Sequence, residues 1–314
     1  MRPILKLTIF CLAIILIAAG FSKKPPAPVE VVTPAPSPVT SPTPVIVDAT
    51  KGRKLLTDIA TTGHCAKELY GDPSKKNPAV KKNQGKAKPG YLKGLVLTYV
   101  KLICEKDQDP ILKQVYNVAT APLGDASKDA LAHYGLKPAS PTDRLNTVAA
   151  MMIGSNARES SWRPCVGRDV AAKASDVKGC LYDGVKYFGG GETCEAGLPQ
   201  TSFNSIKGGV LKELYDAYLE YPRGCFEREF YEGISCDAAN WKNHGKNPAA
   251  VAYQGLAKSC PAFSIESGFV MFRTNRAHYG PLNRKTAEVY PSCVSMFEKV
   301  RVEIEKDPTL CHVL

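Results

Sequence analysis

Apolar residues recur at helical spacing in several segments between residue 49 and the end of the chain. The clearest segment is 140–157, "SPTDRLNTVAAMMIGSNA". The positions that share one face of this segment are Leu145, Val148, Ala149, Met152 and Ile153. Ser140, Pro141 and Asp143 precede them and are typical of a helix N-terminus. The segment therefore predicts an amphipathic helix.

Segments 208–225, "GGVLKELYDAYLEYPRGC", and 287–306, "AEVYPSCVSMFEKVRVEIEK", predict two further helices. Between Cys165 and Cys194 the periodicity breaks into the short aromatic pieces "CLYDGVKYF" and "GGGETC". Because the glycines are turn residues, these pieces predict a small β-hairpin. The expected fold class is α+β and mainly helical, with one small β-hairpin element.

The first 48 residues do not read as a folded domain. Residues 1–20 combine Arg2 and Lys6, an apolar stretch at 7–18 and small residues at the end, which is the pattern of an export signal peptide. Residues 21–48 are rich in proline and predict a solvated linker. We expect a Lys-rich N-terminal helical subdomain at 49–125 and a larger domain at 126–314 that carries the candidate chemistry.

The cysteines support an exported protein. Of the eleven cysteines, Cys11 lies in the signal segment, and the other ten are Cys65, Cys104, Cys165, Cys180, Cys194, Cys225, Cys236, Cys260, Cys293 and Cys311. An even set in an exported chain predicts up to five disulfides, with the pairing left open. The sequence has no Cys-x-x-Cys pair and its five histidines are scattered, so we expect no metal and no cofactor.

The chain is basic, with a formal net charge of +11. Without Arg2 and Lys6 there remain 39 basic and 30 acidic residues, a net charge of about +9. Such a charge favours anionic polymers, including cell walls, and the export signal disfavours nucleic acid. No segment after the signal approaches the roughly 18 apolar residues of a membrane span, so we expect no stable membrane insertion.

Three short motifs lie in order along the second half of the chain. "GSNARESSWRPC" (154–165) places Glu159 directly after the predicted helix; "GLPQTS" (197–202) and "AVAYQG" (250–255) follow. This order resembles the lysozyme-like superfamily of goose-type lysozymes and lytic transglycosylases, whose motifs are "ESS" or "ESG", "GLMQ" and "AYN-x-G". Here Pro199 stands in place of the methionine and Gln254 in place of the asparagine. The resemblance covers roughly residues 142–300 and extends to the lysozymes of predatory bacteria that act on deacetylated peptidoglycan.

The resemblance implies that Glu159 is the catalytic acid and base. The chemistry agrees, because cleavage of a glycoside needs an acid that stays protonated near neutral pH. Desolvation and the negative end of a helix dipole raise the pKa of a carboxyl. The helix supplies the dipole and Trp162 is expected to supply desolvation, whereas Arg158 and Arg163 oppose both unless they point away.

The sequence does not decide which residue would supply a second catalytic carboxylate. Goose-type enzymes carry aspartates on the hairpin after the acid, so the resemblance favours Asp183, with Asp169, Asp176, Glu192 and Glu195 as alternatives. A transglycosylase needs no second carboxylate. The resemblance places the following residues in substrate binding: Ser160, Ser161, Gln200, Ser202, Tyr253, Gln254 and Tyr182.

These observations together predict a secreted or periplasmic muramidase, a monomer with a lysozyme-like fold that acts on peptidoglycan glycan strands. Five acids between 169 and 195 predict that it tolerates or prefers deacetylated glucosamine. A lytic transglycosylase acting on the same bond is the first alternative. A non-catalytic wall-binding or inhibitor protein is the alternative from another class.

Overall fold

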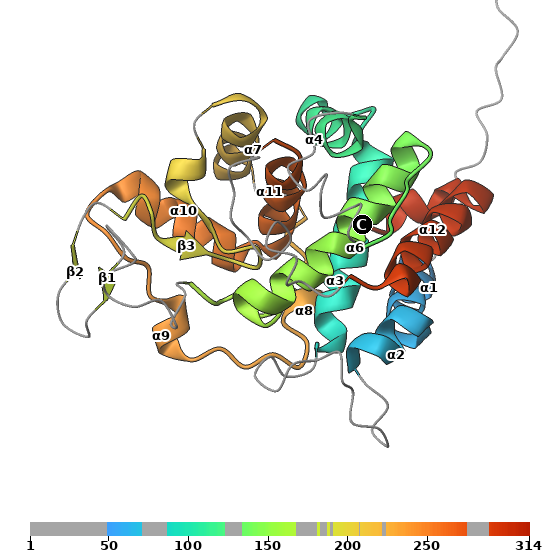
Figure 1. Ribbon diagram of the computed structural model, residues 1–314, viewed down its shortest axis with the longest axis horizontal. Coiled ribbons are helices and arrows are strands. Elements are labelled where there is room, and N and C mark those ends of the chain that lie inside the picture. The colour runs from blue at the N-terminus through green and yellow to red at the C-terminus, as the bar shows by residue number, and fades with distance from the viewer. Residues whose placement is uncertain are drawn as a thin grey trace, which may run out of the picture. The chain divides into compact units, whose positions relative to one another are not determined.

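The chain is mainly helical, as its periodicity predicts (Figure 1). The computed structural model describes residues 49–70, 87–122, 134–167, 181–182, 187–188, 191–206, 208–221, 224–274 and 289–314. The expected signal peptide at 1–20, the linker at 21–48 and the expected subdomain boundary at 125/126 lie outside these residues. Residues 46–314 form one compact unit.

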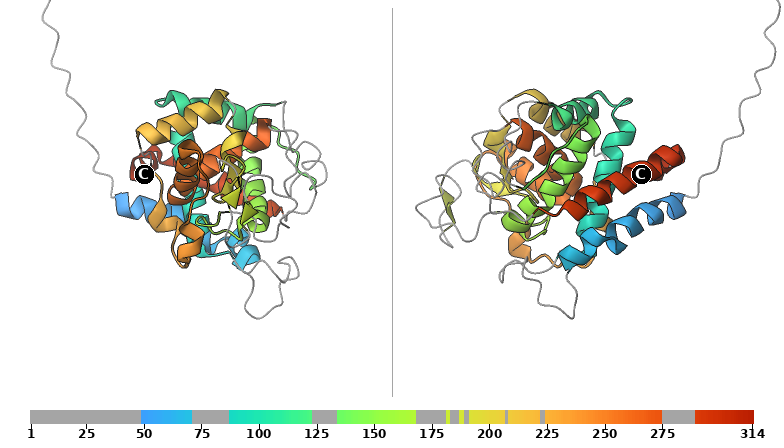
Figure 2. Two further views of the ribbon diagram at one scale, coloured as in Figure 1. Left: turned by 90° about the vertical axis from the view of Figure 1, so that its left-hand side faces the viewer. Right: turned by 45° about the vertical axis from the view of Figure 1, so that its right-hand side comes forward.

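The N-terminal helices surround α3 (Pro89–Glu105), whose residues from Gly90 to Leu102 are buried except Lys93. A helix that is buried on nearly all sides belongs to the core of a protein. Around it lie α1 (Ala49–Thr62), α2 (His64–Tyr70) and α4 (Pro110–Thr120). Figure 2 shows α1 and α12 (Pro291–Lys306) side by side, and η2 (Pro308–Val313) follows α12.

The predicted helix over 140–157 is confirmed as α6 (Pro141–Ser160). Ser140 caps it, because its Oγ accepts from the Asp143 backbone N while the Asp143 side chain accepts from the Ser140 backbone N. The helix packs against α4, α11 (Pro261–Thr274) and α12. All residues of α11 except the last are buried, so α11 is a second core helix.

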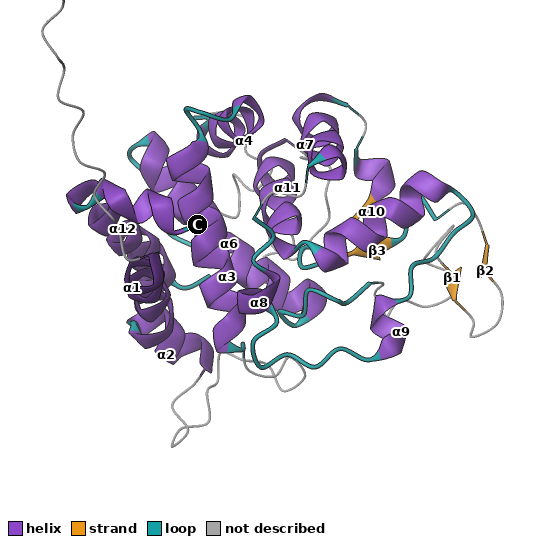
Figure 3. Cartoon of the chain, turned by 180° about the vertical axis from the view of Figure 1, so that it is seen from behind, coloured by secondary structure: helices purple, strands orange, loops and turns teal. Residues whose placement is uncertain are grey.

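The predicted helices at 208–225 and 287–306 are confirmed as α7 (Gly209–Glu220) and α12. Between α7 and α11 lie α8 (Glu227–Phe230), α9 (Ala238–Trp241) and α10 (Pro248–Ser259), joined by long loops (Figure 3). The predicted hairpin is confirmed as β1 (Leu181–Tyr182) paired antiparallel with β2 (Tyr187–Phe188). A second antiparallel pair, β3 (Glu195–Ala196) with β4 (Thr201–Ser202), was not predicted, and η1 (Phe203–Ser205) follows it.

The chain contains disulfides, as the cysteine count predicts, and two of them join elements that are far apart in sequence. Cys65–Cys293 links α2 to α12 and Cys104–Cys311 links α3 to η2, with sequence separations of 228 and 207 residues. Cys165–Cys236 joins the segment after α6 to the loop before α9. Cys225–Cys260 joins the segment before α8 to the junction of α10 and α11. Cys194 is also disulfide-bonded, whereas Cys180 lies outside the described residues. Cross-links of this number are typical of exported proteins.

A buried ionic cluster connects α3, α7 and α11 in the core. Lys101 Nζ lies 3.0 Å from Glu266 Oε1 and donates to the Tyr218 hydroxyl at 2.7 Å, and that hydroxyl donates to Glu266 Oε2 at 2.8 Å. Lys101 and Glu266 are 2% and 0% exposed. Burial, followed by the Glu266 charge, raises the pKa of Tyr218 well above its ordinary value, so the phenol stays neutral and donates. Removing either charged member, Lys101 or Glu266, leaves the other charge buried and uncompensated.

We expect Lys101→Met to lower the free energy of unfolding by about 3–5 kcal/mol, because Glu266 then lacks its cation in the core. Urea unfolding followed by circular dichroism, with disulfides intact, measures the loss. The exposed pair Lys93–Glu232 provides the control, and Lys93→Met should cost less than about 1 kcal/mol. Equal losses in the two variants would contradict a structural role for the buried cluster.

Candidate functional site

Glu159 lies in the last turn of α6, because the helix continues to Ser160. The sequence pattern ended this helix at residue 157, three residues before its observed end, and therefore placed Glu159 just past it. Glu159 is half-buried. The backbone carbonyls at a helix C-terminus carry a partial negative charge, which disfavours an ionised carboxyl at this place.

The chain leaves α6 through two consecutive residues with left-handed backbone conformation, Ser161 (φ 50°) and Trp162 (φ 58°). Neither is a glycine, and such conformations cost an L-residue roughly 1–2 kcal/mol. The buried indole of Trp162 donates from Nε1 to the Ile153 carbonyl at 3.1 Å, which folds it back onto α6. Backbone strain of this kind clusters at functional sites, provided that the surrounding structure enforces it.

The segment that follows, residues 163–167, is joined to the "GLPQ" turn between β3 and β4. The Val166 carbonyl accepts from the Gly197 backbone N at 3.0 Å and from Gln200 Nε2 at 2.9 Å. Gly197 (φ +76°) has no room for a Cβ atom, which would lie 2.6 Å from the Ala257 carbonyl oxygen. The structure therefore brings the first two motifs together and seats the second on the junction of α10 and α11.

Gln200 is the predicted binding residue whose geometry stands out most. It is 2% exposed and has a left-handed backbone (φ 50°), and its Nε2 also donates to the Gly197 carbonyl at 2.6 Å. Within the described part of the chain, its buried Oε1 has no hydrogen-bond partner. Buried acceptors are nearly always satisfied by protein, water or ligand. The Gln200 side-chain amide therefore keeps one acceptor, Oε1, without a hydrogen bond.

Two residues of the third motif, Tyr253 and Gln254, are buried, so their side chains are not exposed to a substrate. Tyr253 is buried among aromatic rings, including Tyr215 and Phe263, and its hydroxyl contacts Thr201 Oγ1 in β4. Gln254 is buried as well: its Oε1 accepts from His244 N at 2.8 Å and its Nε2 donates to His244 O at 2.6 Å. Both side chains therefore position β4 and the loop before α10.

The serines have mixed placements. Ser160 is buried and its Oγ donates to the Asn156 carbonyl at 3.0 Å, so it caps the helix end. Ser161 is half-buried in the left-handed turn. Ser202 is half-buried and its Oγ donates to Asn204 Oδ1 at 2.6 Å.

The predicted second carboxylate is not described. Asp183, Asp169 and Asp176 lie outside the described residues, as does the side chain of Tyr182 on β1. Glu192 and Glu195 are described and half-buried. Glu192 Oε1 accepts from Asn247 Nδ2 at 2.8 Å, and this hydrogen bond together with a backbone one lowers the pKa of Glu192. Glu192 is therefore ionised at neutral pH and held at the N-cap residue of α10.

Sequence reasoning missed Lys258, a lysine on the buried face of α10. It is 1% exposed, and its Nζ donates to the Lys242 carbonyl at 2.9 Å. A Cβ atom on Gly167 would lie only 2.6 Å from this Nζ, so Lys258 packs directly against the segment 163–167. The signal was present: Lys258 follows Gln254 by four residues, on the same helical face as other buried positions.

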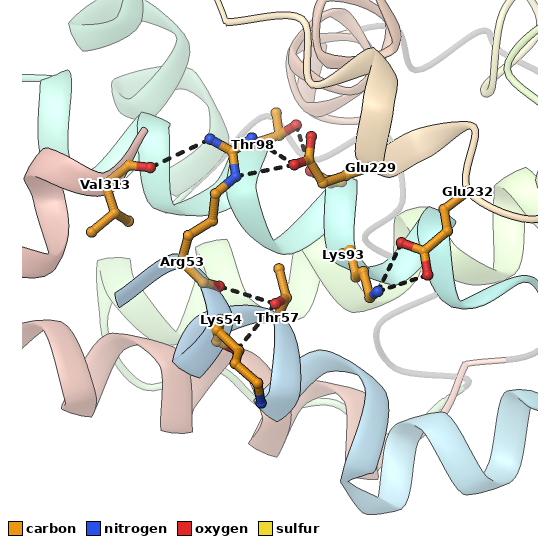
Figure 4. A network of polar contacts seen from close by, with 9 residues as sticks. Arg53, Lys54, Thr57, Lys93, Thr98, Glu229, Glu232 and Val313 are labelled. Atoms are coloured by element: carbon orange, nitrogen blue, oxygen red, sulfur yellow. Dashed lines mark hydrogen bonds and ion pairs between the residues drawn. The ribbon is translucent and has the colours of Figure 1, made fainter. Parts of the chain in front are cut away.

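A hollow of about 780 Å³ lies elsewhere, between α1, α8 and the C-terminal residues. Four of its charged side chains form two ion pairs (Figure 4): Arg53 lies 2.8 Å from Glu229, and Lys93 lies 2.7 Å from Glu232. None of the three motifs contributes to its lining. We therefore assign it to the packing of α8 and not to the candidate site.

Within the described ranges, no group of three or more His, Cys, Asp or Glu side chains is placed to hold a metal ion. None of the helices described is long and apolar enough to cross a membrane. Comparison with protein-family models, with curated proteins and with solved structures finds no match for the chain. The functional argument therefore rests on the motifs and on their geometry.

Burial lowers the pKa of Lys258 from an ordinary 10.5 to about 8. Between these values the unfolded chain binds the proton and the folded chain does not, so raising the pH stabilises the fold. We expect wild type to gain about 2 kcal/mol in unfolding free energy relative to Lys258→Met between pH 7 and pH 9.5. Urea titrations of both proteins at the two pH values measure this difference. A difference that does not change with pH would contradict a desolvated ammonium group.

Proposed function

We propose that the protein is an exported, lysozyme-like glycoside hydrolase that cleaves the β-1,4 bond between N-acetylmuramic acid and N-acetylglucosamine in peptidoglycan. The observation that carries the proposal is the setting of Glu159. This acid sits at the negative end of a helix, and two strained residues follow it. The next segment is hydrogen-bonded to the "GLPQ" turn. The order of the motifs supports the same reading.

In the proposed mechanism Glu159 donates its proton to the leaving glycosidic oxygen and then accepts one from water. Its place at the helix C-terminus favours the protonated form that the first step requires. General acid catalysis by a positioned carboxyl contributes about 10²- to 10⁴-fold. Ser161 and Ser202 would contact the glycan strand, and the buried Gln200 would hold the "GLPQ" turn that leads to Ser202.

For the second carboxylate we propose Asp183, which directly follows β1 in the sequence. It would orient the attacking water in a hydrolase, whereas a transglycosylase dispenses with it. Glu192 is the poorer choice, because Asn247 already holds its carboxylate. The five acids of 169–195 also support tolerance of, or preference for, deacetylated glucosamine, whose amines are partly cationic near neutral pH.

We expect Glu159→Gln to abolish turnover while the fold is retained, because the amide keeps the shape and lacks the transferable proton. Mass spectrometry of peptidoglycan digested by both proteins measures the effect. Reducing ends in the wild-type digest indicate a hydrolase, anhydro ends a transglycosylase, and intact glycan a wall-binding protein. Activity of Glu159→Gln within about tenfold of wild type would sink the assignment, since general acid catalysis is worth more.

We expect Asp183→Asn to reduce hydrolysis by about 10²-fold or more, and Glu192→Gln by less than about tenfold, because only Asp183 is assigned to the water. Initial rates on purified peptidoglycan compare the two. The matched amide variants keep size and hydrogen bonding similar. Equal, small losses would move the role to Asp169 or Asp176, or favour the transglycosylase.

A further inference from the structure

Trp241, the last residue of α9, exposes an indole that is backed by another aromatic ring. It is 42% exposed, although the Tyr231 ring packs against it with centroids 5.5 Å apart and planes inclined by 34°. Burial raises the pKa of Tyr231, so its phenol stays neutral and donates to the Lys258 carbonyl at 2.6 Å. An exposed indole on a fixed aromatic support is a rigid flat surface.

A disulfide, a hydrogen bond and a packing contact connect this surface to residues 165–167, which follow α6. The first is the disulfide between Cys165 and Cys236, and Cys236 precedes Trp241 by five residues. On the other side, Lys258 Nζ donates to the carbonyl of Lys242, the next residue after Trp241. Lys258 also lies against Gly167. Through these links Trp241 is tied to both ends of residues 165–167.

We propose that Trp241, supported by Tyr231, is a stacking platform for a sugar ring of the glycan strand that reaches Glu159. The identity of the strand rests on the proposed function. Pyranose rings present an apolar face of C–H groups with polar hydroxyls at the rim, and an indole face complements that face. Because the platform is held before the ligand arrives, binding costs little conformational entropy. In Figure 1, α9 lies on the same side as β1, β2 and the C-terminal end of α6.

Tryptophan fluorescence tests the platform directly, because the chain has only two tryptophans and Trp162 is buried. The probes are the β-1,4-linked tetramers of N-acetylglucosamine and of glucosamine, added to Glu159→Gln so that nothing is cleaved. We expect at least one tetramer to protect Trp241 from acrylamide quenching. In calorimetry Trp241→Ala should weaken its binding by about tenfold or more, as for an aromatic hot spot, and Trp241→Phe should restore part of it.

Tyr221 provides a matched control, since it is 73% exposed at the end of α7. Tyr221→Ala should leave tetramer affinity unchanged. No protection by either tetramer, or equal affinity of Trp241→Ala and its parent, would overturn the platform. Protection that depends on protein concentration and not on sugar would also overturn it, because a second copy of the chain would then cover Trp241.

The two proposals fail separately. Tetramer binding that depends on Trp241, in a wild-type protein that leaves peptidoglycan uncut, would reject the hydrolase and keep the platform. Cleavage of peptidoglycan with an unchanged KM and unchanged tetramer affinity in Trp241→Ala would reject the platform and keep the hydrolase. Thermal unfolding of each variant checks that the exposed substitution leaves the fold intact.

Discussion

The left-handed turn at Ser161 and Trp162 is the constraint on which the arrangement of the site depends. Two consecutive non-glycine residues in this conformation cost roughly 1–2 kcal/mol each. Burial of the Trp162 indole and its hydrogen bond to the Ile153 carbonyl offset part of that cost. The turn ends α6 at Ser160, one residue after Glu159, and the chain continues to Val166, which accepts a hydrogen bond from the "GLPQ" turn. A helix that continued by one more turn would move Val166 away and lose this contact.

Residues 163–167 are consequently held from three directions. The sheet turn bonds to the Val166 carbonyl, the disulfide at Cys165 links to Cys236, and Lys258 packs against Gly167. Residues 163–167 follow the candidate acid along the chain, and the disulfide and Lys258 also connect them to the Trp241 surface. A change at either of these two links should therefore alter both, although neither Lys258 nor Cys236 belongs to a motif.

Three helices, α6, α7 and α12, could be predicted from sequence because apolar spacing indicates them, as at Leu145 and Val148 in α6. The disulfides could be predicted in number but not in pairing, because pairing depends on distances between helices. Two-residue strands such as β3 carry too little alternation to be recognised. Tyr253 and Gln254 were assigned to substrate binding from the motif alone. Their spacing within α10 places them on its buried face, and this burial decides their role.

Lys101 and Lys258 are both buried, but the partners that hold their ammonium groups differ. Lys101 meets the Glu266 carboxylate and the Tyr218 hydroxyl, so its charge is compensated and it joins three core helices. Lys258 donates instead to a neutral carbonyl, and desolvation lowers its pKa to about 8. A buried charge held by a neutral partner is costly. Lys258 lies against Gly167, in the segment that follows the strained turn and accepts a hydrogen bond from Gln200. The strained turn therefore belongs to residues 161–167, and the buried lysine and the Gln200 amide contact them. This segment connects the candidate acid to the proposed sugar platform, both of which need fixed positions.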